Sequence, residues 1–318
     1  IAMSDWSSDV CSSDLKMIKW SKNYLMGIDK LDEEHKELFR ISDQIYNKVM
    51  ERGDDAKYRL FLMNETLEYM LRYFKRHAKS EEIYMREIGY AGYEFHKMLH
   101  DEFYNMLLKK KADIVKRNEC SKKEIAELVG DGIGWLLEHI TTEDMAIVGK
   151  GISAISSYNS DFEEQLKNVI NTNLISFLNV AANVKIINRN YQGEDFGKVI
   201  CQKMVYNLGS RQIVVISGIE KTFLIRVAEM IYGIDIEDEM DLVLYSMQTF
   251  GANFWRSIGQ YFVGNHDLLS LSSNSFIIAR SIPEELDMLK PEKSLLFDSD
   301  MGKFFIASNG KMSEIAYF

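Results

Sequence analysis

Apolar residues between about residues 30 and 150 recur every three or four positions, the spacing that places them on one face of an α-helix. The first such face starts in LDEEHKELFRIS and comprises Leu31, His35, Leu38, Ile41 and Ile45. Three further periodic segments follow, at about 57–87, 92–117 and 121–140, the last opening on a capping-box sequence, SKKE. Because only a few residues connect these segments, the pattern predicts an up-down four-helix bundle.

The pattern changes at GKGISAISSYNS, which is rich in Gly and Ser, lacks periodicity and predicts a linker. Beyond it we expect a helix at about 161–182, strands at KVICQKMVY and RQIVVISGIE, and helices at KTFLIRVAEMIYG and about 239–262. Three more strand-like runs follow, SFIIA, KSLLF and KFFIAS. The helices cluster rather than alternate with the strands, which favours an α+β fold with an antiparallel or mixed sheet.

A length of 318 residues also suits two domains. We therefore expect an all-α four-helix bundle over residues 16–150, a linker over 151–160 and an α+β domain over 161–318. The first fifteen residues, IAMSDWSSDVCSSDL, share no periodicity with the rest and resemble a translated sequencing adapter. We expect residues 1–15 to form a disordered or artefactual tail.

Charge and cysteine content argue against several kinds of partner and site. The net charge of −10, without a basic stripe, disfavours nucleic acid and anionic membrane surfaces as partners. No apolar run approaches the roughly 20 residues that span a bilayer, so we expect a cytoplasmic protein. The 3 cysteines form no CxxC pair, which argues against a disulfide framework and a thiolate metal site.

Histidine is concentrated in the predicted bundle. Of the 6 histidines, all but His266 lie there, and at least one falls on each predicted helix: His35, His77, His96, His100 and His139. His77 and Glu81 are four residues apart, as are His96 and His100, so each pair shares a helix face. A single helical histidine is usually a surface or satisfied core residue. Five of them on apolar faces would be costly to bury unpaired, which favours a metal site.

The number of candidate ligands points to two metal ions. Nitrogen and oxygen ligands without thiolates suit iron, manganese, zinc or copper. Two irons would offer about twelve coordination positions. Five imidazoles, two bridging carboxylates and a shared oxo or hydroxo group would fill all but one of them, and a small molecule such as dioxygen would bind at the vacancy.

The segments WSKNYLMGIDKLDEEHKELF, HAKSE, HKMLH and HITTED resemble those of bacterial hemerythrins, from about Trp20 to Gly149. The resemblance implies two iron ions with a bridging oxo or hydroxo group, and O2 as the ligand. It assigns His35 and His77 to one iron and the histidines His96, His100 and His139 to the other. It also implies that Glu81 and Asp144 bridge the two ions.

One spacing in this set is awkward. His139 and Asp144 are five residues apart, about 140° around an ideal helix. Both reach one site only if the helix is under-wound there or if the side chains converge from different angles. Glu143, four residues from His139, is the geometric rival, but we follow the resemblance and predict Asp144. Glu82 and Glu138 are expected to be solvated neighbours or hydrogen-bond partners of the ligands.

The composition of the ligand set bears on the chemistry. Di-iron carboxylate proteins built in helical bundles use four glutamates and two histidines. Anionic oxygen ligands favour the high-valent iron needed to cleave dioxygen, whereas the set here is mostly neutral imidazole. We therefore expect reversible O2 binding.

The second half resembles CheX/CheC-type chemotaxis phosphatases over roughly residues 165–310, through a helix, a strand pair and an acidic turn leading into a long helix. That family carries Glu-x-x-Asn on the long helix after a leading aspartate. Alignment on Asp241 places Tyr245 at the glutamate and Gln248 at the asparagine. Gln248 is thus a weak candidate for orienting water, and the alternative is an ordinary exposed helix residue. Whether this half is an enzyme stays open.

Together these features predict an oxygen or redox sensor coupled to a chemotaxis or two-component output domain. A phosphorylated receiver-domain response regulator is a candidate partner, and a homodimer through the C-terminal domain is a second expectation. Two alternatives are kept: an O2 storage or scavenging protein with a dimerising appendage, and an O2-gated response-regulator phosphatase.

Overall fold

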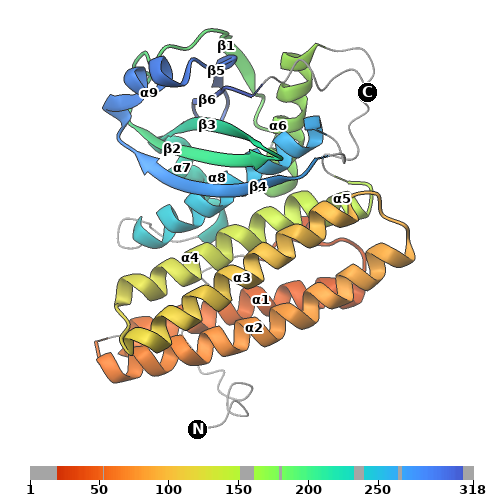
Figure 1. Cartoon of the computed structure of the whole chain (residues 1–318), viewed down its shortest axis with the longest axis vertical. Coiled ribbons are helices and arrows are strands. Elements are labelled where there is room, and N and C mark those ends of the chain that lie inside the picture. Colours follow the sequence, from red (N-terminus) through yellow and green to blue (C-terminus); the bar gives the residue numbers. More distant parts are fainter. Residues whose placement is uncertain are drawn as a thin grey trace.

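The computed structural model describes residues 20–52, 54–150, 161–178, 181–232, 240–263 and 267–310. The predicted tail at 1–15 and the predicted linker at 151–160 lie outside the described residues. Figure 1 shows the long helices of the first half lying side by side, with the sheet and its helices stacked on one side of them. Helices in the first half and an antiparallel sheet in the second agree with the predicted order, α and then α+β.

The predicted four-helix bundle is present. Its helices are α1 (Asp29–Arg52), α2 (Ala56–Glu87), α3 (Tyr93–Arg117) and α4 (Lys122–His139). A short 3₁₀ turn, η2 (Lys22–Tyr24), precedes them, and α4 continues through η3 (Ile140–Asp144) into α5 (Met145–Ile147). The capping box forms as expected, because the Ser121 hydroxyl accepts from the Glu124 amide and the Glu124 carboxylate accepts from the Ser121 amide.

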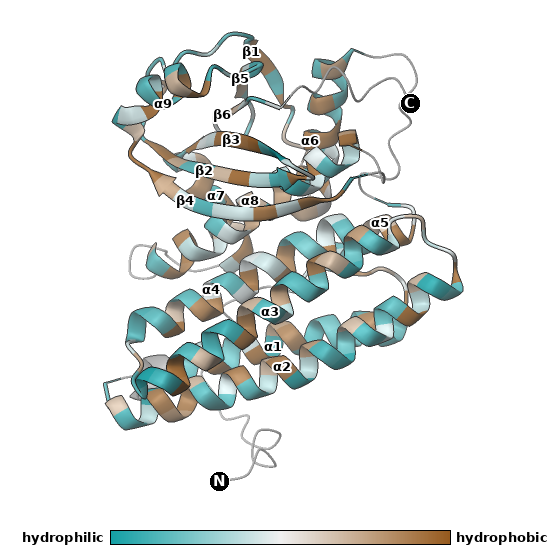
Figure 2. Ribbon diagram, in the orientation of Figure 1, coloured by the Kyte–Doolittle hydropathy of each residue, from teal (hydrophilic) through white to brown (hydrophobic). Residues whose placement is uncertain are grey.

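Apolar side chains fill the space between the four helices. The core of the bundle includes Leu67, Phe74, Leu107 and Ile133, each no more than 2% exposed. Figure 2 shows hydrophobic positions where the helices face one another and hydrophilic positions along the outer side of the bundle. Burial of this apolar stripe, rather than helix propensity, is what holds such helices together. Within the part of the chain that the structure describes, no helix is both long and apolar enough to span a bilayer.

The second half is a six-stranded sheet with helices. Its helices are α6 (Phe162–Leu178), α7 (Lys221–Tyr232), α8 (Met240–Val263) and α9 (Ile282–Leu289), with a 3₁₀ turn, η5 (Ala279–Ser281). The strands are β1 (Lys185–Asn188), β2 (Val199–Leu208), β3 (Arg211–Glu220), β4 (Leu269–Ile277), β5 (Lys293–Asp298) and β6 (Phe304–Ser308). They are ordered β1-β5-β6-β3-β2-β4, and neighbouring strands are antiparallel.

Three elements differ from the expectation. The sequence did not predict β1 or α9, both of which are short. Strand β4 begins at Leu269, well before the predicted run SFIIA. Its first part was missed because it consists mostly of serines and an asparagine, with few apolar residues. A strand at the edge of a sheet needs little apolar surface, so its pattern is weak.

Helix α8 joins the two halves, since it packs against α4 on one side and against β2 and β4 on the other. Two glycines of α4 make the contact close: a Cβ atom on Gly134 would lie 2.1 Å from the carbonyl oxygen of Ser246, and one on Gly130 would lie 2.7 Å from Cβ of Tyr245. Residues 132–145 are all buried as a result. Helix α4 is therefore covered by the bundle on one side and by the sheet domain on the other.

Candidate metal centre

The seven predicted ligands all lie in the core of the bundle, each no more than 2% exposed: His35, His77, Glu81, His96, His100, His139 and Asp144. They come from five elements. α1 carries the first, α2 and α3 carry two each, α4 carries His139 and η3 carries Asp144. The structure therefore brings together all the residues predicted as metal ligands.

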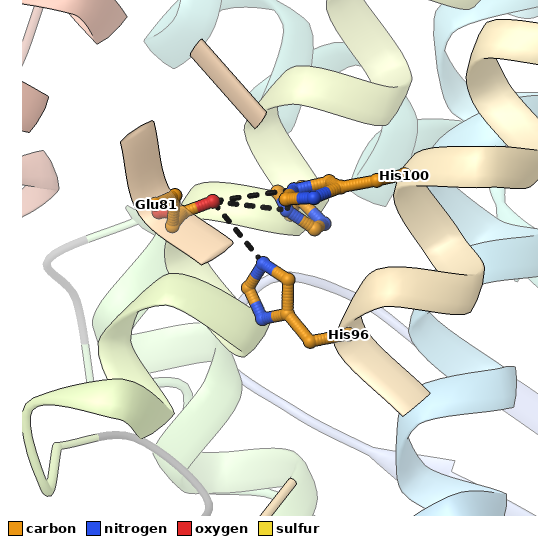
Figure 3. A group of neighbouring side chains, drawn as sticks. Glu81, His96 and His100 are labelled. Carbon is orange, nitrogen blue, oxygen red and sulfur yellow. Dashed lines mark hydrogen bonds and ion pairs between the residues drawn. The ribbon is translucent and has the colours of Figure 1, made fainter. Parts of the chain in front are cut away.

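Glu81 lies between two groups of histidines. Its Oε2 is 3.2 Å from Nε2 of both His96 and His100, and Figure 3 shows the carboxylate pointing toward these two rings. The same oxygen is 3.9 Å from Nε2 of His139 and 4.0 Å from Nε2 of His77. Two sets of possible ligand atoms, each within 4.8 Å of one another, share this residue: Glu81 with His96, His100 and His139, and Glu81 with His35 and His77.

Asp144 lies between the same two groups. Its Oδ2 is 3.1 Å from Nε2 of His35, and its Oδ1 is 3.3 Å from Nε2 of His139 and 3.5 Å from Nε2 of His96. Asp144 thus faces one histidine group with Oδ2 and the other with Oδ1, whereas Glu81 approaches both groups through Oε2. This is the position that a bridging ligand needs.

The five-residue spacing of His139 and Asp144 is accommodated by a π-helical turn. Segment η3 is a π-helix, and the amide of Met145 reaches the carbonyl of Ile140, five residues back. A wider turn returns every fifth residue to the same side, so both side chains face the site. Glu143, the geometric rival, is turned the other way, toward Ser257 of α8.

Burial decides the protonation of the histidines. It lowers the pKa of His35, His77, His96 and His139, which keeps these imidazoles neutral, the form that binds metal ions. Burial acts the same way on His100, but the hydrogen bonds that its ring donates to Glu81 and Glu82 outweigh it and raise its pKa to about 9. Burial would also raise the pKa of Glu81, but its contacts with His100, His139 and His96 hold that pKa well below the ordinary value, whereas burial raises the pKa of Asp144.

Several of these buried atoms lack a hydrogen-bond partner: Nε2 of His35 and of His77, Oε1 of Glu81, and both carboxylate oxygens of Asp144. A buried polar atom without a partner is strongly destabilising. Metal ions accepting their lone pairs would remove that cost, and a donor set of nitrogen and oxygen without sulfur suits first-row transition metals. The residues present therefore fit a pair of metal ions.

Two carboxylates contact ligand histidines at Nδ1, the ring nitrogen that does not face the site. Oε2 of Glu34 is 3.0 Å from Nδ1 of His77, and Oε1 of Glu82 is 3.3 Å from Nδ1 of His100. Such contacts fix the tautomer that presents Nε2 to a metal. Glu82 was anticipated as a partner, but Glu34 was missed, because a residue next to a ligand on a helix carries no periodic signal. Glu138 does not contact a ligand ring and instead accepts from Ser257 of α8 at 2.8 Å.

Aromatic and aliphatic residues adjoin the centre. The indole of Trp135 stacks on the ring of His139 with centroids 4.1 Å apart, and Phe74 packs edge-on against His100. A cavity of about 30 Å³ lies beside them, lined by Leu38, Ile41, Phe74, Phe103 and Trp135 among others. These residues exclude bulk water from this side of the site.

Gln248, the weak candidate of the second half, is not among the residues that converge at this centre. It is half-buried on α8, and its Nε2 donates to the carbonyl of Asn274 on β4 at 3.4 Å. Tyr245 packs against Gly130 of α4 and hydrogen-bonds with Lys123 and Glu127. Both side chains are half-buried and hydrogen-bond to other parts of the chain.

Comparison with known proteins agrees with this geometry. The model of the Hemerythrin HHE cation binding domain matches residues 26–150. Bacteriohemerythrin of Clostridium acetobutylicum is 29% identical over 128 residues, which are 40% of this chain and 96% of that protein. Hemerythrin subunit 1 of Golfingia vulgaris is 30% identical over 131 residues (41% and 90%), and myohemerythrin of Theromyzon tessulatum is 28% identical over 132 residues (42% and 92%). Through its helical bundle, this chain belongs to the hemerythrin family.

Proposed function

We propose that the bundle holds two iron ions, binds dioxygen reversibly and serves as an oxygen or redox sensor for the C-terminal domain. One observation carries the proposal: five buried histidines form two groups, and the carboxylates of Glu81 and Asp144 lie between them. His35 and His77 would hold one ion, and His96, His100 and His139 the other. Glu81 and Asp144 would bridge the two. Bound iron would supply the reversible binding of dioxygen.

The protein's own residues support this chemistry in two ways. Glu34 and Glu82 accept from Nδ1 of their histidines, so Nε2 stays free for the metal. Trp135, Phe74 and their apolar neighbours keep water from the ions, and neutral imidazoles disfavour the high-valent states that cleave dioxygen. Binding without turnover is the expected outcome.

Iron quantification together with a visible spectrum tests the metal centre. We expect two irons per chain and an absorption band that disappears under argon and returns in air. His77→Ala should lower the iron content, whereas His266→Ala, which removes the one histidine outside the bundle sequence, should leave it at two. Less than one iron per wild-type chain, or a band that never returns, would refute the proposal.

The sensor role is favoured over simple storage by the packing of α4. This helix and η3 carry His139 and Asp144, and their opposite side rests on α8 of the C-terminal domain. Coupling requires that the contacts of α8 differ in free energy between the oxygenated and deoxygenated states. Hydrogen exchange of α8 under argon and under air measures that difference. Identical exchange would favour the storage alternative.

Response-regulator dephosphorylation is the alternative function in which the C-terminal domain would be an enzyme. The Gln248 amide donates to β4 and Tyr245, also on α8, packs against Gly130 of α4, which weakens the phosphatase alternative. Incubation with a phosphorylated receiver domain, with and without O2, tests it directly. A homodimer through the C-terminal domain and a cytoplasmic location stay predictions.

A further inference from the structure

The π-helical turn has two faces, and each displays a pair of residues five apart. His139 and Asp144 face the metal site, while Glu138 and Glu143, one position earlier in each case, face α8. Both glutamates are buried, at 1% and 7% exposure. The wide turn that brings His139 and Asp144 together therefore also brings Glu138 and Glu143 together.

Ser257 of α8 lies between the two outer glutamates. Its hydroxyl donates to Oε1 of Glu138 at 2.8 Å, and it also hydrogen-bonds with Glu143. The serine is itself only 3% exposed. One side chain of the C-terminal domain thus links Glu138, just before the π-helical turn, to Glu143, near its end.

Arg256, the next residue of α8, adds charge beside the same pair. Its guanidinium is 3% exposed, forms an ion pair with Glu102 of α3 and donates to Asn253 at 2.6 Å. Its positive charge also acts on both outer glutamates. Glu102 follows His100 by two residues, so Arg256 links α8 to a second ligand-bearing helix.

The close glycine contacts fix the register of this arrangement. With the backbones of α4 and α8 touching at Gly134, neither helix can slide along the other without a steric clash. A further hydrogen bond, 2.8 Å from Thr249 to Asp131, lies about two helical turns away from Ser257 along α8. Ser257 and Arg256 are therefore held rigidly against the outer face of the turn.

We propose that Ser257 and Arg256 are positioning residues, which brace the π-helical turn from outside and so set how Asp144 meets the metal pair. The inference rests on the proposed metal centre. A π-helical turn is rare and persists only where its surroundings support it. Without the brace the turn relaxes toward an α-helix, in which Asp144 points about 140° away from His139. The bridge through Glu81 does not depend on the brace.

Ser257→Ala in the full chain tests the proposal, with Thr249→Ala as the matched control, because each removes one hydroxyl bonded across the same interface. We expect Ser257→Ala to weaken Co²⁺ binding about 10-fold or more and to change the visible ligand-field bands, as loss of a residue supporting a ligand does. Thr249→Ala should leave both properties unchanged. Ser257→Cys keeps nearly the same side-chain volume and a weak hydrogen-bond donor. Its Co²⁺ affinity should lie between those of the two alanine variants, and it replaces Ser257→Ala in the test if that variant unfolds.

A double-mutant cycle separates positioning from general loosening of the interface. In an Asp144→Ala background, Ser257→Ala should have no further effect on Co²⁺ affinity, because its action passes through that carboxylate. Equal losses in both backgrounds, or equal losses for Ser257→Ala and Thr249→Ala, would overturn the inference. Wild-type protein that binds no Co²⁺ would refute the metal centre itself, so the two failures are distinguishable.

Discussion

Replacing Gly134 by alanine puts a single methyl group between α4 and α8. Its Cβ atom would lie 2.1 Å from the carbonyl oxygen of Ser246 and 3.1 Å from the amide nitrogen of Phe250. Both are backbone atoms of a helix packed on the sheet, so no side-chain rotation relieves the clash. The two helices must move apart by roughly 1 Å to restore an ordinary contact distance.

Two opposing effects set the size of the change. Alanine stabilises a helix interior by about 1 kcal/mol relative to glycine. Overpacking a core costs about 1–3 kcal/mol, and we take the upper part of this range because backbone blocks the methyl group. The net expectation is a loss of about 1–2 kcal/mol in the free energy of unfolding.

Gly132→Ala supplies the control within the same helix. Its Cβ would meet only the flexible Cε end of Met70, at 3.2 Å, so the helix gain of up to about 1 kcal/mol should remain. Urea unfolding of the full-length protein, followed by circular dichroism and by tryptophan fluorescence, should place the two midpoints on opposite sides of wild type. Equal shifts for both variants would refute the close-packed interface.

Three further predictions concern the ligands and the thiols. Glu34→Ala should weaken metal binding about 10–100-fold because His77 loses its hydrogen-bond partner. Glu33→Ala, on the exposed side of the helix, should leave the affinity unchanged, and equal affinities of the two variants in a Co²⁺ titration would contradict this. Chelation should lower the free energy of unfolding, and free metal at 100 times the dissociation constant should restore about 2.7 kcal/mol; a urea midpoint insensitive to metal would count against the site. Cys120 and Cys201 should resist a disulfide reagent until urea unfolds the protein, because burial raises their pKa values to about 11 and about 12, and mass spectrometry after native labelling checks this.

The helices and the residues that converge between them could be predicted because their signal is local. His77 and Glu81 share a face by helical spacing alone, and Ser121 with Glu124 marks a helix start. The spacing of His139 and Asp144 left two possibilities, an under-wound segment or side chains converging from different angles, and the structure has the first as η3. Periodicity reports which residues share a face of one element, so these features follow from short stretches of sequence.

The contact between the two halves could not be predicted in this way. Gly134 and Ser246 are separated by more than a hundred residues, and a glycine inside a helix shows only that something could approach closely. Glu138 was expected near a ligand or in solvent, yet it is buried against Ser257. Strand β4 was detected only at its apolar end, because pairing with β2 rather than its own sequence holds the rest. Each of these features depends on tertiary packing.

The C-terminal part of α4 is buried on all sides, and this ties the stability of the bundle to that of the second half. Residues 132–145 keep no side in water, and one continuous apolar core runs from Phe74 and Ile133 in the bundle to Phe250 and Trp255 on α8. A fragment that ended after α5 would expose this surface, bare glycines included, and would tend to aggregate. The two halves are therefore expected to fold, and to be degraded, as a single cooperative unit, even though their sequences suggest separate modules.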